Sequence, residues 1–301
     1  MTNFSSIALK DTCQAYFELC KPRVVALMLL TALVGMFLAC SSLPHWQPMI
    51  GGSLGIACMA GAAATLNHLL DHSFDKLMKR TQKRPLPTCR IKPRNAGLFA
   101  LLLASFGMLI LLLFVNTLTA LLTLLTLFGY AIVYTCYLKH ATPQNIVIGG
   151  IAGAAPPLLG WTAITNQIDP NSLLLVLIIF IWTPPHFWAL AIHRHQDYSR
   201  AAIPMLPVTH GIPFTKWCIL LYTILLVPVS TLPFVTNMSG VVYLLGALGL
   251  GIGFLYYATA LQISKNPQIP LKMFRYSIIY LFGLFVILLL DHYIIAAGGS
   301  H

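Results

Sequence analysis

Three polar side chains spaced four residues apart are the first feature of this sequence that could do chemistry. Asn67, Asp71 and Asp75 end an apolar stretch, in the segment NHLLDHSFDKLMKRTQKRPL at residues 67–86. Four residues advance an α-helix by about 400°, so the three side chains lie on one stripe that rises roughly 6 Å per step. Two carboxylates this close repel each other unless a cation lies between them. The spacing therefore predicts a cation site at an exposed helix end.

Magnesium suits this pair of carboxylates. It takes oxygen ligands, keeps several waters and commonly binds one or two carboxylates together with substrate phosphates. The basic residues that follow would contact the remaining phosphate oxygens, the arginines in a bidentate manner; they are Lys79, Arg80, Lys83 and Arg84. The alternative is an ordinary helix end whose acids pair with nearby bases and whose lysines meet anionic lipid headgroups. Spacing alone leaves both interpretations open.

The apolar composition sets the fold class. The chain has 301 residues, of which 58% are hydrophobic and only 8% are charged. Apolar runs of about 17–25 residues, each long enough to cross roughly 30 Å of hydrocarbon, recur along the whole chain. Because helices satisfy their own backbone hydrogen bonds in lipid, the sequence predicts an all-α polytopic membrane protein, a single domain over residues 1–301. We expect a bundle of about nine transmembrane helices, at 24–40, 49–70, 96–115, 117–137, 145–164, 171–192, 215–236, 239–262 and 274–296.

The basic residues indicate how the chain crosses the membrane. With nine spans, all 18 Lys and Arg residues fall on one side, whereas the opposite segments 41–48 and 165–171 contain none. By the positive-inside rule the N-terminus is cytoplasmic and the C-terminus is periplasmic. The net charge of +11 thus reflects topology and not nucleic-acid binding. The first residues resemble neither a cleaved signal nor a transit peptide, so a bacterial inner membrane is the simplest location.

Two cytoplasmic polar loops suggest internal symmetry. They lie at about 71–95 and 193–214, after the second and sixth predicted spans. Their matching positions suggest two pseudo-related halves that face each other.

The first loop resembles a known motif. Asn67, Asp71 and Asp75 followed by MKRTQKRPL (78–86) resemble the first aspartate-rich motif of the UbiA superfamily of intramembrane prenyltransferases, in the form of its haem-farnesylating branch. CKPRVVALML (20–29), YLKHATPQNIVIGGIAGAAPPLLGW (137–161) and WTPPHFWALAIHRHQDYSRAAIPMLPV (182–208) resemble further blocks of that branch. Together these segments extend over about the first 210 residues, and the remaining spans support only the architecture.

The resemblance implies a reaction and its substrates. Farnesyl diphosphate would bind with its diphosphate on Mg²⁺, Asp71 and Asp75, clamped by Arg80 and Arg84, and with its tail in an apolar groove open to lipid. A vinyl group of haem b would attack the farnesyl cation and water would add, giving haem O for terminal oxidases. Contact with haem A synthase or with the assembly of a terminal oxidase would follow from such a product.

Further residues could contact the diphosphate. Asn67 and Lys79 belong to the first motif, and Asn145 resembles the family's polar residue that faces the diphosphate. Lys21 and Arg23 precede the first span, where they would either reach the diphosphate or anchor the helix at the headgroups.

The second polar loop departs from the family pattern. Related prenyltransferases carry a second pair of aspartates four residues apart, whereas this chain has His193 and Asp197. Imidazole is a poor ligand for Mg²⁺. We therefore expect Asp197 to assist the metal, while His193 and Arg194 donate to a phosphate or a haem propionate. A solvated loop histidine is the alternative for His193, and the ring of Tyr198 would stabilise a cation.

His186 lies next to two prolines within the sixth predicted span. Pro184 and Pro185 are expected to break the helix there, so a polar His would line a cavity. It would either ligate haem iron or pack between helices as a hydrogen-bonded side chain. The small residues of 149–161 are open to two interpretations as well, close helix packing or space for a flat macrocycle.

Two other functions compete with haem farnesylation. One is prenylation of an aromatic quinone precursor, which the aspartate motif fits equally well. The other is a non-enzymatic anion transporter, which would place charged residues near the middle of the bilayer. Asp71, Asp75 and Asp197 lie instead at the ends of predicted spans.

The topology can be tested with a reporter fused after His301. The one-sided basic residues predict that this reporter registers as periplasmic, whereas a reporter inserted after Lys265 registers as cytoplasmic. A cytoplasmic signal from His301 would contradict nine spans with the N-terminus inside.

Overall fold

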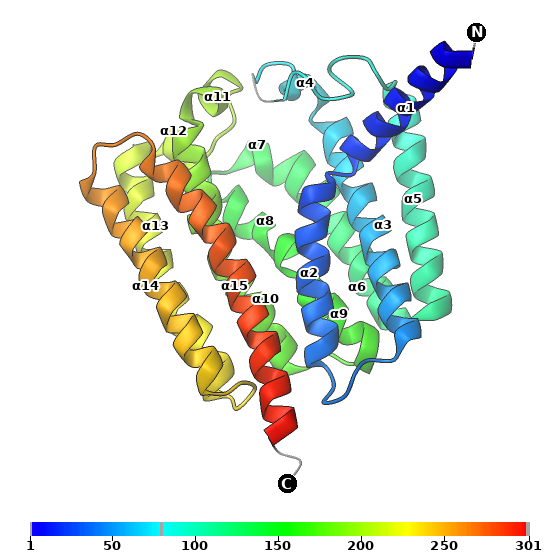
Figure 1. The fold of residues 1–301 in the computed structure, drawn as a ribbon. Helices are drawn as coiled ribbons and strands as arrows, with labels where there is room; N and C mark the ends of the chain where they lie inside the picture. The colour runs from blue at the N-terminus through cyan, green and yellow to red at the C-terminus, as the bar shows by residue number, and fades with distance from the viewer. Residues whose placement is uncertain (1, 79–80, 299–301) are drawn as a thin grey trace.

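Helices form all the regular structure in the described part of the chain. The computed structural model describes residues 2–78 and 81–298, with the side chains of 11–78, 81–139 and 141–294 (Figure 1). The N-terminal part contains α1 (Thr2–Leu19), α2 (Pro22–Leu38), α3 (Trp46–Leu70), α4 (His72–Asp75), α5 (Pro93–Phe114), α6 (Thr117–Phe128), the π-helix η1 (Gly129–Leu138) and α7 (Lys139–Ala141). The C-terminal part contains α8 (Asn145–Ala154), α9 (Pro156–Thr165), α10 (Pro170–His193), α11 (His195–Arg200), α12 (Leu206–Thr209), α13 (Gly211–Val235), α14 (Val241–Ile263) and α15 (Ile269–Gly298).

The predicted spans are confirmed in position, and the described chain has eight of them, or nine with the bent pair α1 and α2. Eight segments of the described chain are long and apolar enough to cross a membrane, from Trp46–Leu70 to Ile269–Ile294. The ninth is α2, which has 17 residues and is joined to α1 at a bend of 50°. Prolines begin several of these helices, where a missing N–H costs no hydrogen bond. The side chains of Asn116 and Asp169 cap α6 and α10 by accepting backbone N–H groups at 2.8 Å.

The spans form two groups joined in the middle of the molecule (Figure 1). In the first group α3 packs against α5 and α2, and α2 packs against α9. In the second group α10 packs against α13 and α15, with α14 on their outer side, and α8 joins α10 to η1. α15 also reaches α2, so the last span contacts the first. The predicted pseudo-symmetry between the groups stays a prediction.

Both polar loops lie at the same end of the bundle. α4, α11 and α12 gather at the top of Figure 1, whereas the described chain ends at the bottom, on the opposite face from α1. The two clusters singled out in the sequence therefore share one membrane face.

Small residues bring neighbouring helices into close contact. A Cβ added to Gly160 would lie 1.9 Å from the backbone oxygen of Ala32, and one added to Gly35 would lie 2.2 Å from that of Pro157. α2 and α9 thus touch backbone to backbone. A Cβ on Gly149 would collide with the ring of Tyr134 at 2.2 Å. At these positions the small residues serve helix packing, as one of the two interpretations predicted.

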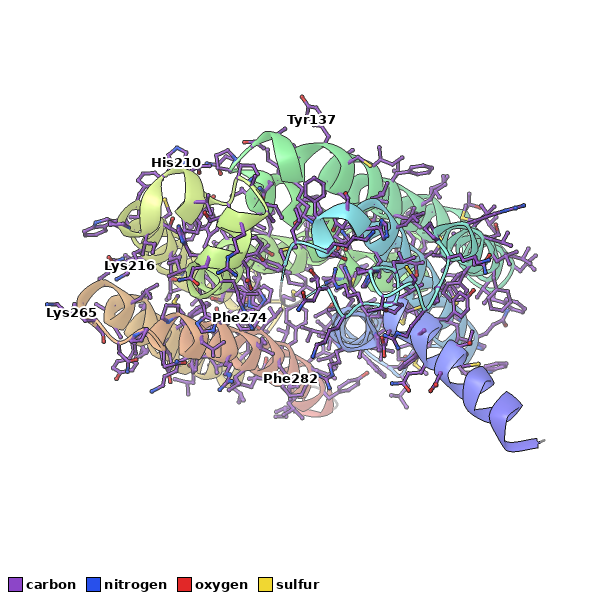
Figure 2. The ribbon with its side chains drawn as sticks, turned by 90° about the horizontal axis from the view of Figure 1, so that it is seen from above. Tyr137, His210, Lys216, Lys265, Phe274 and Phe282 are labelled. Atoms are coloured by element: carbon purple, nitrogen blue, oxygen red, sulfur yellow. The ribbon has the colours of Figure 1, made fainter. Side chains whose placement is uncertain are left out.

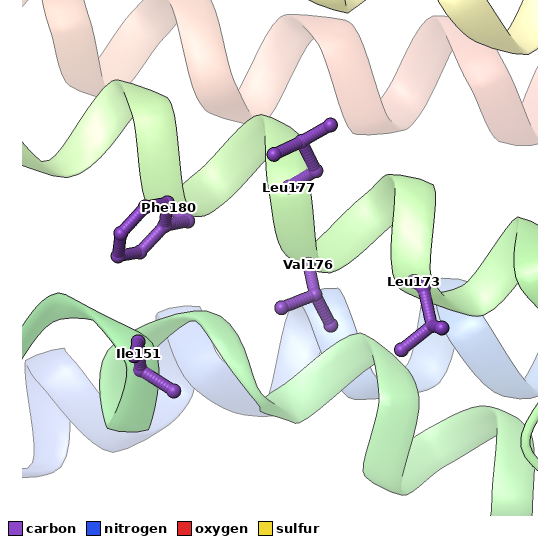
Figure 3. A pocket seen from close by; sticks show the side chains of 5 residues that line it. All are labelled: Ile151, Leu173, Val176, Leu177 and Phe180. Atoms are coloured by element: carbon purple, nitrogen blue, oxygen red, sulfur yellow. The ribbon is translucent and has the colours of Figure 1, made fainter.

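An apolar groove opens on the outside of the bundle between α8 and α10. Its volume is about 270 Å³, and Figure 3 shows its lining side chains, Ile151, Leu173, Val176, Leu177 and Phe180. Ile151 and Leu173 are about half exposed, as expected for side chains that face lipid tails.

The expected helix break at Pro184 and Pro185 is wrong. α10 continues through both prolines from Pro170 to His193. A proline has a helical φ, but it cannot donate a backbone hydrogen bond, and its ring clashes with the carbonyl group of the preceding turn. Dense packing offsets this cost, because both prolines are buried and the segment is held between α8, α13 and α15.

Candidate functional site

The predicted polar stripe is present at the junction of α3 and α4. The backbone N–H of Asp71 donates to Asn67 at 3.0 Å and that of Asp75 donates to Asp71 at 2.9 Å, so the four-residue repeat continues across the junction. The prediction of an exposed helix end is wrong, however. Asp71 is only 2% exposed and Asp75 only 1%. The loop that follows α4 covers Asp75, and Lys139, which is distant in sequence, covers Asp71.

Each carboxylate has a cationic partner. Lys139 Nζ lies 2.6 Å from Asp71 Oδ2, and Arg84 Nη1 donates to Asp75 Oδ1 at 2.9 Å and to Oδ2 at 2.7 Å. Asn67 links the pair to a third cation, since its Nδ2 donates to Asp71 Oδ2 at 2.9 Å while its Oδ1 accepts from Lys21 Nζ. Lys21 lies within electrostatic range of both carboxylates and both other cations. The five charged groups therefore form one cluster.

Local structure holds these side chains in place. Thr81 Oγ1 donates to the backbone oxygen of Asp75 at 2.9 Å, and the backbone N–H of Arg84 donates to Thr81 at 3.0 Å, which folds the loop back over the acids. Lys21 has a left-handed backbone conformation with φ of 50° at the bend between α1 and α2. Such a conformation costs a non-glycine residue on the order of 1–3 kcal/mol and is retained where the surroundings require it.

Sequence reasoning missed Lys139 as a site residue. It appeared only as a topology marker at the end of the fourth span. The available signal was its isolation, because it is the single basic residue between Arg94 and Arg194. Its side chain reaches Asp71 from the end of η1, where the wide π-helical turn is marked by Thr135 Oγ1 donating five residues back to Tyr130 at 2.8 Å. π-Helical turns frequently occur at functional sites.

The donor set fits a magnesium ion. Asp71 Oδ1 and Asn145 Oδ1 are buried oxygens with no hydrogen-bond partner among the described residues. Asp75, by contrast, uses both oxygens on Arg84. The described residues contain no group of three His, Cys, Asp or Glu side chains able to hold a metal. Mg²⁺ does not need one, because it commonly takes one or two carboxylates and completes its shell with water and substrate phosphate.

The charge of the cluster fits a polyanion. Three basic side chains face two carboxylates, so the site carries a surplus of positive charge whenever Lys21 is protonated; burial lowers the pKa of Lys21 to about 7. A diphosphate together with a divalent metal would complete the compensation. The geometry can thus hold a metal-bound phosphate ester at the edge of the membrane.

The other predicted residues of the first cluster differ in position. Asn145 is fully buried at the start of α8, where its Nδ2 donates to the backbone oxygen of Thr142 at 2.8 Å. Arg23 is exposed, as the headgroup alternative expected. Lys79 and Arg80 lie outside the described residues.

The second cluster is looser than the first. Asp197 lies in α11, 3.9 Å from Arg194 Nη1, and His193 ends α10 half-buried. Tyr198 and Asp71 both lie within electrostatic range of Tyr134 in η1. The metal role of Asp197 stays a prediction.

His186 packs between α10 and α15. Its Nδ1 lies 2.6 Å from Ser277 Oγ, and its ring stacks on Trp182 at 4.2 Å and on Phe274 at 4.5 Å. These contacts match the packing interpretation of this histidine.

Comparison with known proteins decides the family. The sequence profile of the UbiA prenyltransferase family matches residues 28–286. The chain belongs to the UbiA prenyltransferase family. This UbiA prenyltransferase is 58% identical over 97% of its length to a protoheme IX farnesyltransferase of Marinobacter nauticus, covering 96% of that protein. It is 60% identical over 92% of its length to one of Legionella pneumophila, covering 95% of it.

Solved structures support the same fold. A digeranylgeranylglyceryl phosphate synthase superposes with a TM-score of 0.78 at 17% identity, over 94% of this chain and 99% of that one. A UbiA homolog from Archaeoglobus fulgidus bound to GPP and Mg²⁺ gives a TM-score of 0.67 at 18% identity, over 91% and 99%. The prediction of a UbiA-type helical bundle is therefore confirmed, and bound Mg²⁺ occurs in this family.

The pairing of Asp71 with Lys139 generates a prediction for this UbiA prenyltransferase. Lys139→Met leaves a buried carboxylate without its cation, which should lower the free energy of unfolding of the metal-free protein by about 3 kcal/mol. Added Mg²⁺ should stabilise this variant more than the wild type, because the ion replaces the missing charge. Thermal unfolding in detergent with EDTA and with excess Mg²⁺ measures both effects. Lys92→Met, at an exposed lysine of the first loop, is the control. Equal loss in the two variants would contradict the pairing.

Proposed function

We propose that this UbiA prenyltransferase transfers a farnesyl group from farnesyl diphosphate to a vinyl group of haem b, with addition of water, to give haem O. The observation that carries the proposal is the relationship to proteins named protoheme IX farnesyltransferase, at 58–60% identity over more than nine-tenths of the chain. The buried cluster supplies the matching chemistry, a site for a metal-bound diphosphate.

The first cluster holds the leaving group. Arg84, Lys139 and Lys21 bind the diphosphate oxygens, and Asp71 and Asp75 are the ligands for the metal. Mg²⁺, when bound, supplies positive charge that stabilises the departing diphosphate. The cations of the protein are already fixed where negative charge develops as the carbon–oxygen bond breaks, so little reorganisation is needed. Arg80 and Lys79 extend this clamp.

Residues of the second loop bind the haem that accepts the farnesyl group. Asp197 assists the metal, while His193 and Arg194 donate hydrogen bonds to a haem propionate. Tyr198 presents its ring to the allylic cation. Because Tyr134 lies within electrostatic range of both Tyr198 and Asp71, the acceptor and the leaving group meet near η1.

The farnesyl tail needs an apolar surface that continues from the diphosphate site into the membrane. The groove between α8 and α10 has such a lining, and Ile151 lies about 9 Å along α8 from Asn145. A tail lying there stays in contact with lipid, as the sequence analysis expected.

Prenylation of a quinone precursor is the rival function, and the aspartate cluster fits it equally well. The named relatives favour haem. An anion transporter is disfavoured, because Asp71 and Asp75 lie at the end of a span and have fixed cationic partners. The same proposal includes transfer of haem O to haem A synthase or to a terminal oxidase during its assembly.

The function can be tested by mass spectrometry of haem extracted from bacterial inner membranes that contain the protein. Wild-type protein should give haem O, whereas Asp71→Asn and Asp75→Asn should each reduce it by about 100-fold or more, since each removes a carboxylate that holds the metal–diphosphate complex. Asp11→Asn, at an exposed acid of α1, should leave the yield unchanged. A prenylated quinone precursor without haem O, or near-normal haem O from Asp71→Asn at equal expression, would contradict the proposal.

A further inference from the structure

A second cavity lies on the outer side of the charged cluster. It has a volume of about 400 Å³, far above the ~10–15 Å³ that one water needs. It is bordered by the loop that follows α4. Its lining residues come from α1, α2, α3 and that loop, and they are Glu18, Lys21, Val24, His68, Lys83, Arg84 and Pro85.

The charged lining is predominantly positive. Lys21, Lys83 and Arg84 contribute three cations, and Glu18 is the one acid. The charge of Glu18 is already offset, because its Oε2 lies 2.6 Å from Arg90 Nη2. Lys83 is exposed and has no ion pair within the described residues. Arg84 is already paired with Asp75 and Lys21 with Asn67, so an anion entering this cavity would find Lys83 as the cation that has no ion pair within the described residues.

Arg84 separates this cavity from the inner cluster. Both of its hydrogen bonds to Asp75 use Nη1. Among the described residues no acceptor is found for its Nε and Nη2, so these donors remain for a ligand on the other side. Lys83, the preceding residue in the chain, lines the outer cavity and is absent from the hydrogen bonds of the inner cluster. Its place thus differs from the phosphate clamp expected from the sequence.

We propose that this outer cavity, which shares Lys21 and Arg84 with the inner cluster and adds Lys83, is a second anion site that takes a phosphate-bearing ligand. Lysine and arginine donors at the edge of a membrane suit phosphate oxygens, which occur both on inorganic diphosphate and on the headgroup of an anionic phospholipid. Free diphosphate would be held there on its way from the inner cluster to the cytoplasm. A lipid headgroup would instead fix the bend between α1 and α2, with its tails beside the exposed Val24.

Two binding measurements without turnover distinguish inorganic diphosphate from a lipid headgroup as the ligand. In the first, inorganic diphosphate is titrated calorimetrically into protein in phosphatidylcholine nanodiscs with EDTA. In the second, native mass spectrometry measures how much phosphatidylglycerol the detergent-solubilised protein retains. Neither measurement contains farnesyl diphosphate or haem, so failure here is distinct from failure of the proposed reaction.

Three variants give the expected pattern. Lys83→Gln should weaken binding of one of the two ligands by about tenfold or more, because it removes one hydrogen bond to a charged group. Glu18→Gln should tighten the same ligand, a gain that a damaged fold would not give. Lys265→Gln is the control, because this exposed lysine lies at the far side of the bundle from α1 (Figure 2). A response in the diphosphate arm identifies a free anion, and a response in the lipid arm identifies a headgroup. If Lys83→Gln behaves like Lys265→Gln in both arms, or Glu18→Gln fails to tighten either ligand, the outer site does not exist.

Discussion

The compensation of two buried carboxylates by three cations is the constraint on which this end of the molecule depends. An unpaired carboxylate out of water costs several kcal/mol, so Asp71 and Asp75 can be buried only if their partners arrive with them. Those partners come from three separate segments, the junction of α1 and α2, the loop after α4 and the end of η1. Charge pairing thus ties together four parts of the chain at this end of the bundle, in addition to the apolar contacts that α3 makes with α2 and η1.

The same cluster explains how the site can be stable and yet accept a ligand. In the protein alone, lysine and arginine satisfy the carboxylates, and one oxygen of Asp71 is left without a partner. Under the proposed function a metal and a diphosphate would enter by exchanging charges within the cluster, since the metal would take over the acids and the phosphates would take over the cations. Either ligand alone would leave part of the cluster uncompensated. We therefore expect the site to favour joint binding.

The sequence predicts the bundle well, because lipid imposes a simple rule on span length and composition. The nine spans were predicted at their observed positions, and so was the stripe of Asn67, Asp71 and Asp75. The pairing of Asp71 with Lys139 crosses 68 residues and depends on a π-helix that no local pattern indicates. Burial of the acids was likewise unpredictable, since it depends on how the loop after α4 folds back over Asp75 and on the distant Lys139. The helix through Pro184 and Pro185 shows tertiary packing overriding a local preference.

Joint binding of metal and diphosphate is the central claim, and calorimetry tests it most directly. A farnesyl diphosphate analogue with a non-cleavable carbon–sulfur link is titrated into the protein at a series of fixed Mg²⁺ concentrations, with chelation in solution measured in a blank. We expect saturating Mg²⁺ to raise the affinity for the analogue by about tenfold or more, and this coupling to disappear in Asp71→Asn. An affinity for the analogue that is the same with and without Mg²⁺, or a coupling that persists in Asp71→Asn, would contradict the account.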